Sequence, residues 1–343
     1  MAQVRFVILA IKERRPYCPP GSPISLQIQS LRRRCFMVEK HHDPFVAGIE
    51  AGGTKFVCAV GNGPENLNRK EFPTENPAEV LANVTQWLGE QQRIRGKLEA
   101  IGIGSFGPLD LDERSQTYGY ITSTPKPGWK NVDLVGAIRM AFPGLPVGVD
   151  TDENAAALGE YRWGNARGLQ DFVYVTLGTG IGGGGMSGGR LIHGLVHPEM
   201  GHMLLPRISG DTFAGVCPYH GACWEGLCSG PAIRERTGLP AEDLPSEHEL
   251  WVIETQYIAH AVANILYVLS PQRIIIGGSV AKAGQLGSVR FFGMIRRKLE
   301  TALNNYISSS AVQEAMDSFV VPPLQGDNAG ILGGIALAQM CID

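Results

Sequence analysis

The chain has 343 residues, of which 44% are hydrophobic, and a formal net charge of −3 at pH 7. This length and hydrophobic content suffice for two domains, each with its own core. The charge disfavours a general nucleic-acid binder, and no stretch approaches the roughly 20 uninterrupted apolar residues that cross a bilayer. The 7 cysteines are too few for a disulfide scaffold. We expect a small-molecule partner, no nucleic acid, no membrane and a reducing, cytoplasmic compartment.

Residues 1–44 differ from the rest of the chain, because they are rich in arginine, contain the proline cluster CPPGSP and have no sustained periodicity. They are typical of a disordered or dispensable N-terminal extension, and Met37 is an alternative start. The apolar run FVILAI is too short for a secretory signal, whereas an organellar transit peptide stays an alternative.

From residue 45 the pattern becomes regular. FVAGIEAGGTKFVCAV predicts a strand, a small-residue turn at 51–53 and a second strand from Thr54. Asn76 and Pro77 predict a helix start, followed by an apolar face of Val80, Val84, Trp87 and Leu88. AIGIGSFGPLDL then predicts a buried strand that ends in another glycine turn.

The second half repeats this plan, since DFVYVTLGTGIGGGGMSGGRLIHG again predicts strand, glycine turn and strand. The halves therefore look like weakly similar duplicates. Neither turn matches the P-loop pattern or a GxGxxG dinucleotide motif. Two glycine hairpins in matching positions can cradle phosphate groups on backbone N–H groups, although each could be a tight turn and nothing more.

Four later segments are also informative. PVGVDTDENAAALGEYRWG places Asp150, Asp152 and Glu153 at the start of a helix. Helix capping explains such carboxylates, but there the ionised form is stabilised and could accept a proton at neutral pH. SPQRIIIGGSVA predicts a strand that ends at a ligand-binding edge, LWVIETQYIAHAVANILYVL a core helix, and AGILGGIALAQM a closing helix.

Together these motifs resemble the ROK family of sugar kinases. The motifs are GIEAGGTKF, TDENAAALGE, LGTGIGGG, HPEMGH with CPYHGACWEGLCSGPAI, and IIIGGSV. The resemblance covers 45–343 and implies an α/β, two-lobed actin/hexokinase-like (ribonuclease H-like) fold with an interlobe cleft. The N-terminal lobe would span 45–150, completed by a C-terminal helix at 328–343, and the C-terminal lobe 151–327.

The resemblance also implies a role for individual residues. Asp152 would be the general base toward the sugar hydroxyl, and Mg²⁺ would accompany ATP. The residues placed at the sugar are Gly107, Pro108, Glu199, His202 and Glu225. Those placed at the phosphates or the adenosine are Gly52, Gly53, Thr54, Lys55, Thr179, Gly180, Gly277 and Gly278. Relatives commonly form homodimers.

Three positions depart from the wider family. Glu50 replaces the commoner aspartate before Gly-Gly-Thr, Thr151 replaces the commoner asparagine before Asp152, and the cysteine run is CxxHxxC. The last two, with TPKPGW at 124–129, resemble the bacterial fructokinase-like branch. The expected function is ATP-dependent phosphorylation of the 6-hydroxyl of D-fructose. A glucokinase, mannokinase or N-acylhexosamine kinase stays an alternative, and a non-catalytic sugar-sensing regulator a remote one.

The stretch CPYHGACWEGLCSG predicts a zinc site. Cys217, His220 and Cys223 supply three ligands, and the fourth is expected to be His202, with Cys228 as the alternative. A disulfide and unligated buried thiols are the competing interpretations. Four protein ligands leave no open position on the ion, so the zinc would be structural.

Overall fold

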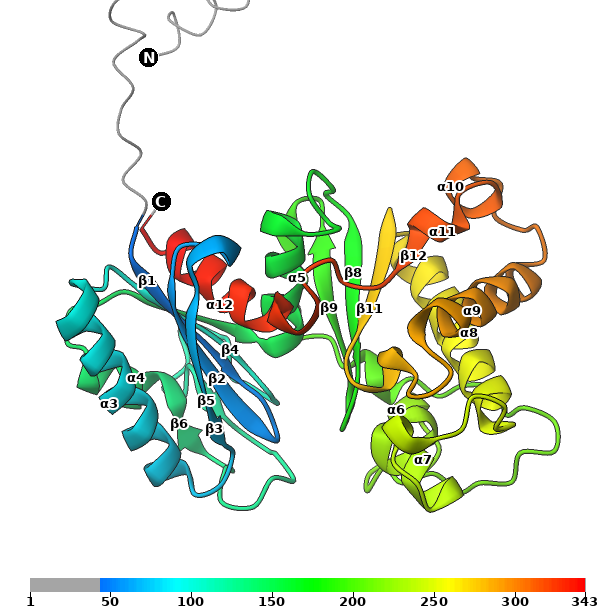
Figure 1. Cartoon of the computed structure of the whole chain (residues 1–343), viewed down its shortest axis with the longest axis horizontal. Coiled ribbons are helices and arrows are strands. Elements are labelled where there is room, and N and C mark those ends of the chain that lie inside the picture. Colours follow the sequence, from blue (N-terminus) through cyan, green and yellow to red (C-terminus); the bar gives the residue numbers. More distant parts are fainter. Residues whose placement is uncertain (1–43, 343) are drawn as a thin grey trace, which may run out of the picture. The chain divides into compact units, whose positions relative to one another are not determined.

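The computed structural model describes residues 44–342. The predictions made for the N-terminal extension, up to residue 43, lie outside this range. The described residues form one compact unit that contains two five-stranded sheets. Figure 1 shows helices α5 (Asp152–Trp163) and α12 (Ala329–Met340) between these sheets.

The first sheet has the strand order β3-β2-β1-β4-β7. Strands β1, β2 and β3 are joined as antiparallel neighbours, whereas β1, β4 and β7 run parallel. The predicted glycine hairpin is therefore confirmed, with the second strand beginning at Lys55 instead of Thr54. The strand bounds are β1 (Val46–Ala51), β2 (Lys55–Gly61), β3 (Asn68–Pro73), β4 (Ile101–Ser105) and β7 (Val147–Thr151).

The second sheet has the matching order β10-β9-β8-β11-β12, with the same antiparallel and parallel pairing. This agreement confirms the duplicated plan predicted from the two hairpins. Its strands are β8 (Phe172–Leu177), β9 (Ile181–Ser187), β10 (Arg190–Leu191), β11 (Arg273–Gly277) and β12 (Val320–Val321), and a separate ribbon pairs β5 (Tyr120–Ile121) with β6 (Val132–Asp133).

Each sheet is covered on its outer face by its own helices. Helices α3 (Pro77–Arg95) and α4 (Leu134–Ala141) form a core with the first sheet. The start of α3 is as predicted, since Asn76 accepts a hydrogen bond from the Ala78 N–H and Pro77 opens the helix. The four residues predicted for its apolar face, Val80, Val84, Trp87 and Leu88, are all buried.

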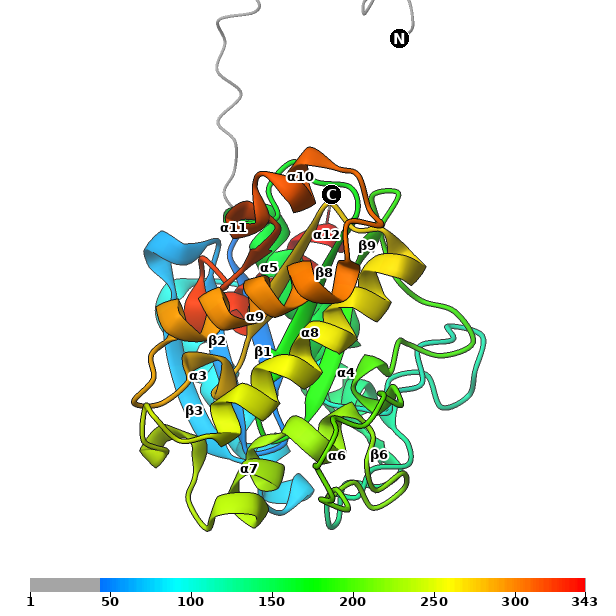
Figure 2. The same ribbon diagram turned by 90° about the vertical axis from the view of Figure 1, so that its right-hand side faces the viewer.

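Helices α8 (Leu250–Leu269) and α9 (Ser288–Leu303) cover the second sheet, as Figure 2 shows. Within the described residues, α8 is the one helix long and apolar enough to cross a bilayer. Most of its apolar side chains are buried against the sheet and neighbouring helices, so here it is a core helix, as predicted. The remaining helices are short: α6 (Trp224–Cys228), α7 (Gly230–Thr237), α10 (Ser310–Gln313) and α11 (Met316–Phe319).

Helix α12 packs on β1, β4 and α5, and so brings the last helix of the described residues against their first strand. Glycine permits this close approach. A Cβ on Gly333 would lie 1.7 Å from the Ala155 carbonyl oxygen of α5, and one on Gly102 would lie 2.0 Å from the Gly334 carbonyl oxygen. The glycines in AGILGGIALAQM thus allow the backbone of α12 to contact the backbone of elements far away in the sequence. The division into two mobile lobes stays a prediction.

Candidate active site and metal site

A cavity of about 420 Å³ opens between the two sheets. Both glycine hairpins, the start of α5 and the loop before α12 contribute to it. Its lining includes Glu50, Gly52, Gly53, Thr54, Lys55, Asp152, Glu153, Thr179, Gly278, Lys282 and Asp327. Most of the residues predicted to bind nucleotide therefore face one space, with Asp152 among them.

The first glycine turn joins β1 to β2. The Gly52 N–H donates to the Lys55 carbonyl over 3.0 Å, and the Thr74 hydroxyl donates to the Gly52 carbonyl over 2.7 Å. Gly53 and Thr54 at the tip of the turn are exposed. Their backbone N–H groups are thus presented without bulky side chains in front, as a phosphate loop requires.

The second glycine turn joins β8 to β9, and Gly278 lies behind it. Gly278 has a φ of 93°, and a Cβ there would lie 2.3 Å from the Leu177 carbonyl oxygen, so glycine is needed at this position. Thr179 and Gly278 line the cavity. Gly180 instead lies against the Glu225 carboxylate, and Gly277 against the Tyr174 hydroxyl, outside the cavity lining.

The cap of α5 is not supplied by the acidic cluster. The Thr151 hydroxyl accepts the hydrogen bond from the Asn154 N–H and caps the helix. Asp150 is buried and accepts hydrogen bonds from the Thr151 N–H and the Asn154 side chain, both at 2.8 Å. The His193 ring also contacts Asp150, with Nε2 2.9 Å from Oδ2. Asp150 therefore braces the turn, and Asp152 is left facing the cavity.

The electrostatics of Asp152 differ from our expectation. We predicted that the helix N-terminus would stabilise its ionised form, but burial raises the pKa of Asp152 above its usual range, against the hydrogen bonds that lower it. Burial also raises the pKa of Glu153 and brings that of Glu50 to about 7. Desolvation outweighs the helix terminus here because Asp152 is buried, and the nearby Glu50 carboxylate raises its pKa further.

The residues predicted to hold the sugar come from three segments. Glu199 is half-exposed, with one carboxylate oxygen 3.9 Å from His202 Nε2. Glu225 accepts a 3.0 Å hydrogen bond from the Ile181 N–H, which ties it to the second glycine turn. The Pro108 carbonyl accepts hydrogen bonds from Thr122, and Gly107 precedes it through a cis peptide bond.

His197 links two of these segments, and our sequence reasoning missed it. The ring is buried, and its Nε2 accepts a 3.1 Å hydrogen bond from the Leu109 N–H. A neutral ring that accepts at Nε2 carries its proton on Nδ1, which lies 3.7 Å from the Glu199 carboxylate. His197 thus hydrogen-bonds the 107–109 loop and lies next to Glu199, so its ring is in contact with both segments. The histidine of HPEMGH that precedes Glu199 was the available signal.

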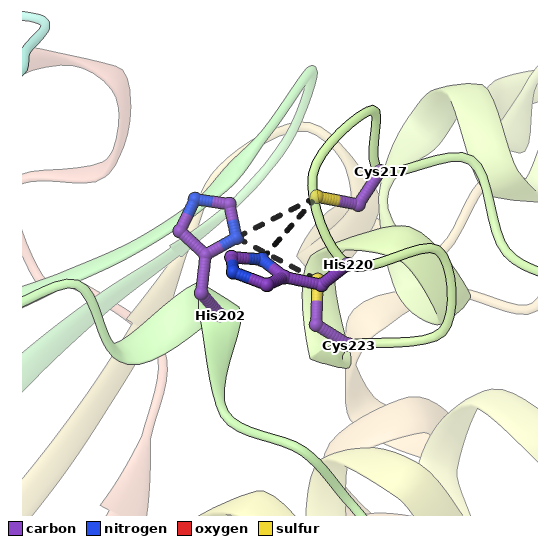
Figure 3. A group of neighbouring side chains, drawn as sticks. All are labelled: His202, Cys217, His220 and Cys223. Atoms are coloured by element: carbon purple, nitrogen blue, oxygen red, sulfur yellow. Dashed lines mark hydrogen bonds between the residues drawn. The ribbon is translucent and has the colours of Figure 1, made fainter.

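The four predicted metal ligands converge, as Figure 3 shows. His202 Nδ1 lies 3.8 Å from Cys217 Sγ and 3.6 Å from Cys223 Sγ, and His220 Nδ1 lies 3.7 Å from Cys217 Sγ. A tetrahedral zinc ion with ordinary bond lengths separates its sulfur and nitrogen ligands by roughly 3.6 Å. The donor set and spacing are compatible with zinc.

Cysteine chemistry supports the same interpretation. Cys217 and Cys223 are free thiols, so the disulfide alternative is not seen. Cys228, the alternative fourth ligand, is fully buried beside Glu254 and does not join the group. The fourth member of the group is therefore His202.

Known proteins resemble this chain over most of its length. The ROK family pattern matches residues 46–340. A fructokinase of Zymomonas mobilis is 43% identical over 296 residues, 84% of this chain and 95% of the relative. A fructokinase of Pediococcus pentosaceus is 41% identical over 87% of this chain and 98% of the relative. The crystal structure of a ROK hexokinase from Thermus thermophilus superposes with a TM-score of 0.68 at 26% identity, over 87% and 99% of the two chains. The predicted fold is thereby confirmed.

Proposed function

The chain belongs to the ROK family, and on that premise we propose that it is an ATP-dependent fructokinase, which phosphorylates the 6-hydroxyl of D-fructose. The observation that carries the proposal is Asp152, a carboxylate that faces the cavity between two glycine turns while Thr151 caps its helix. The fructokinases at 41% and 43% identity support fructose as the sugar.

Asp152 has the role of general base. As the fructose O6 attacks the γ-phosphorus of ATP, Asp152 takes the O6 proton, and the bond from that phosphorus to the β,γ-bridging oxygen breaks. ADP departs with the electron pair of that bond, and fructose 6-phosphate remains. The raised pKa of Asp152 suits this task, because a base is most effective when its pKa approaches the working pH.

MgATP occupies the cavity in this scheme. The two glycine turns present backbone N–H groups to its phosphates, and Gly278 lies at the adenosine side. Glu50 and Glu153 offer carboxylate oxygens of the kind that Mg²⁺ prefers, directly or through water, while Asp152 is left to act as the base. A bound Mg²⁺ would supply positive charge against the phosphates. The Glu50 carboxylate, at the position where aspartate is commoner, lines the cavity next to Gly330.

The cysteine and histidine group is proposed to hold a structural Zn²⁺. His202, Cys217, His220 and Cys223 would complete a closed tetrahedral shell, with no position for substrate or water. The role of the ion is then to fix the loop that leads to Glu225 and to orient His202. The Nε2 of His202, on the side away from the thiols, stays turned toward Glu199.

A homodimer and a cytoplasmic location remain parts of the proposal. Light scattering of the purified protein tests whether it is a homodimer.

A hexose panel tests the function. The purified protein is assayed with MgATP and fructose, glucose, mannose or N-acetylmannosamine, and ADP release is followed by a coupled reaction. We expect fructose to have the highest kcat/KM and the product to be the 6-phosphate, identified by ³¹P NMR. Equal or better turnover of another hexose would reassign the substrate, and no turnover of any hexose would refute the kinase.

A further inference from the structure

Lys126 belongs to a segment that contacts both the turn predicted to hold phosphate and the loop predicted to hold sugar. Its ammonium donates a hydrogen bond to the Gly53 carbonyl over 2.5 Å, at the tip of the first glycine turn. The two residues are 73 positions apart in the chain. On its other side, the segment is joined to the 107–109 loop, because Thr122 donates from both its N–H and its hydroxyl to the Pro108 carbonyl.

Trp129 fixes the segment that carries Lys126. Its ring is fully buried, contacts Phe56 and Phe106 with centroids 5.1 and 5.6 Å away, and donates from Nε1 to the Glu75 carbonyl over 2.9 Å. The Trp129 N–H also donates to the Lys126 carbonyl over 3.2 Å. The backbone of Lys126 is therefore held in place, and its side chain extends from this fixed point to the first glycine turn.

Lys126 differs from the cations that line the cavity in its hydrogen-bond partner. Lys55 and Arg69 both pair with Glu71, and Lys282 pairs with Asp327. Within residues 44–342, Lys126 forms no ion pair with a carboxylate, and its partner is a neutral carbonyl. An ammonium has three N–H donors, so two remain after the bond to Gly53. An anion near the tip of the turn would meet an uncompensated positive charge.

We propose that Lys126 binds the transferred phosphoryl group, as the γ-phosphate of ATP and then as the 6-phosphate of the product. This inference rests on the proposed kinase function. The Lys126 ammonium lies at the tip of the turn predicted to hold phosphate. The same segment is bonded through Thr122 to the loop predicted to hold sugar, and the phosphoryl group must pass between these two regions. Lys126 forms no covalent bond with the phosphoryl group. Its contribution is to stabilise charge on the equatorial phosphoryl oxygens, which is the main requirement of this transition state.

The test separates phosphoryl binding from support of the turn. In Lys126→Met the ammonium is lost and the aliphatic stem is kept, while Lys130→Met removes an exposed ammonium from the same segment and is the matched control. Calorimetry with Mg²⁺ measures affinity for AMPPNP, which has a γ-phosphate, and for ADP, which does not. Fructose 6-phosphate and fructose form the second such pair.

For Lys126→Met we expect about 10-fold to 100-fold weaker binding of AMPPNP and of fructose 6-phosphate, with ADP and fructose within twofold of wild type. Turnover falls by a similar factor, Lys126→Arg recovers part of it, and Lys130→Met changes neither. Equal weakening of ADP and AMPPNP would overturn the proposal, because Lys126 would then only shape the turn. Unchanged AMPPNP binding and turnover would also overturn it.

Two further comparisons keep the outcome clear. Thermal denaturation identifies a variant that does not fold, and Lys126→Gln then replaces Lys126→Met in the same measurements. The wild-type protein is assayed in parallel. Failure of wild type to phosphorylate fructose would refute the proposed substrate, whereas the difference between AMPPNP and ADP in the variant decides on Lys126 independently of the sugar.

Discussion

Replacement of His197 by phenylalanine tests the link between the 107–109 loop and Glu199. Phenylalanine keeps a planar ring in the buried site but accepts no hydrogen bond, so the Leu109 N–H loses its partner. An unsatisfied buried N–H costs about 1 to 3 kcal/mol. We expect the free energy of unfolding to fall by an amount in this range.

The same substitution should weaken sugar binding. If about 1 kcal/mol of that cost destabilises the fructose-bound protein relative to the free protein, KM for fructose rises roughly 5-fold. KM for ATP should stay within twofold, because the hydrogen bond that is lost holds the predicted sugar loop and neither glycine turn.

Steady-state kinetics with each substrate varied, together with urea denaturation, make these measurements. His197→Gln is the matched variant, since its amide oxygen can accept from the Leu109 N–H and its N–H₂ can donate toward Glu199. We expect Gln to recover most of the fructose affinity. The reasoning is refuted if His197→Phe leaves KM for fructose unchanged, or if Gln and Phe cause the same loss. His260→Phe, which alters a histidine bonded to Gln256 on α8, controls for loss of an imidazole elsewhere.

Three further predictions concern the base and the metal. Asp152→Asn should lower kcat by about 10²-fold to 10⁴-fold. Fructose binding and stability should be kept, because Thr151 and not Asp152 caps α5. Calorimetry and kinetics check these expectations, and an unchanged rate would exclude Asp152 as the base. The base must be ionised, and burial raises its pKa, so kcat/KM should fall on acidification at a higher pH than an ordinary aspartate would give; a pH profile with its limb near pH 4 would contradict this. Chelation of zinc should lower the melting temperature and raise KM for fructose together, and metal analysis should find one zinc per chain; metal-free protein with normal turnover would refute the structural role.

Local patterns in the sequence predicted the elements well. The bounds of α8 and α12 coincide with the apolar segments chosen from the sequence, and Asn76 with Pro77 marked the start of α3. Periodicity and capping depend on residues within a few positions of one another, so a linear chain displays them directly. The order of the motifs likewise indicated the family before any contact was known.

The site was predicted less completely, because its decisive contacts join distant residues. The sequence gathered three carboxylates at the start of α5, but the structure decided that Thr151 caps the helix, Asp150 braces the turn and Asp152 faces the cavity. Burial of Asp152 then reversed the pKa shift expected from the helix terminus. Neither the exposure nor the desolvation of a carboxylate can be read from its neighbours in the chain.

The sequence by itself determined the strands and hairpins, the identity of the family and the residue types available for phosphate, sugar and metal. Only the tertiary structure decided which of them meet. It brought His202 to Cys217 and Cys223 while Cys228 was buried elsewhere, and it placed His197 beside Leu109 and Lys126 beside Gly53. Such pairs arise when two sheets and their loops pack together, and no local spacing encodes which backbone group a distant side chain will reach.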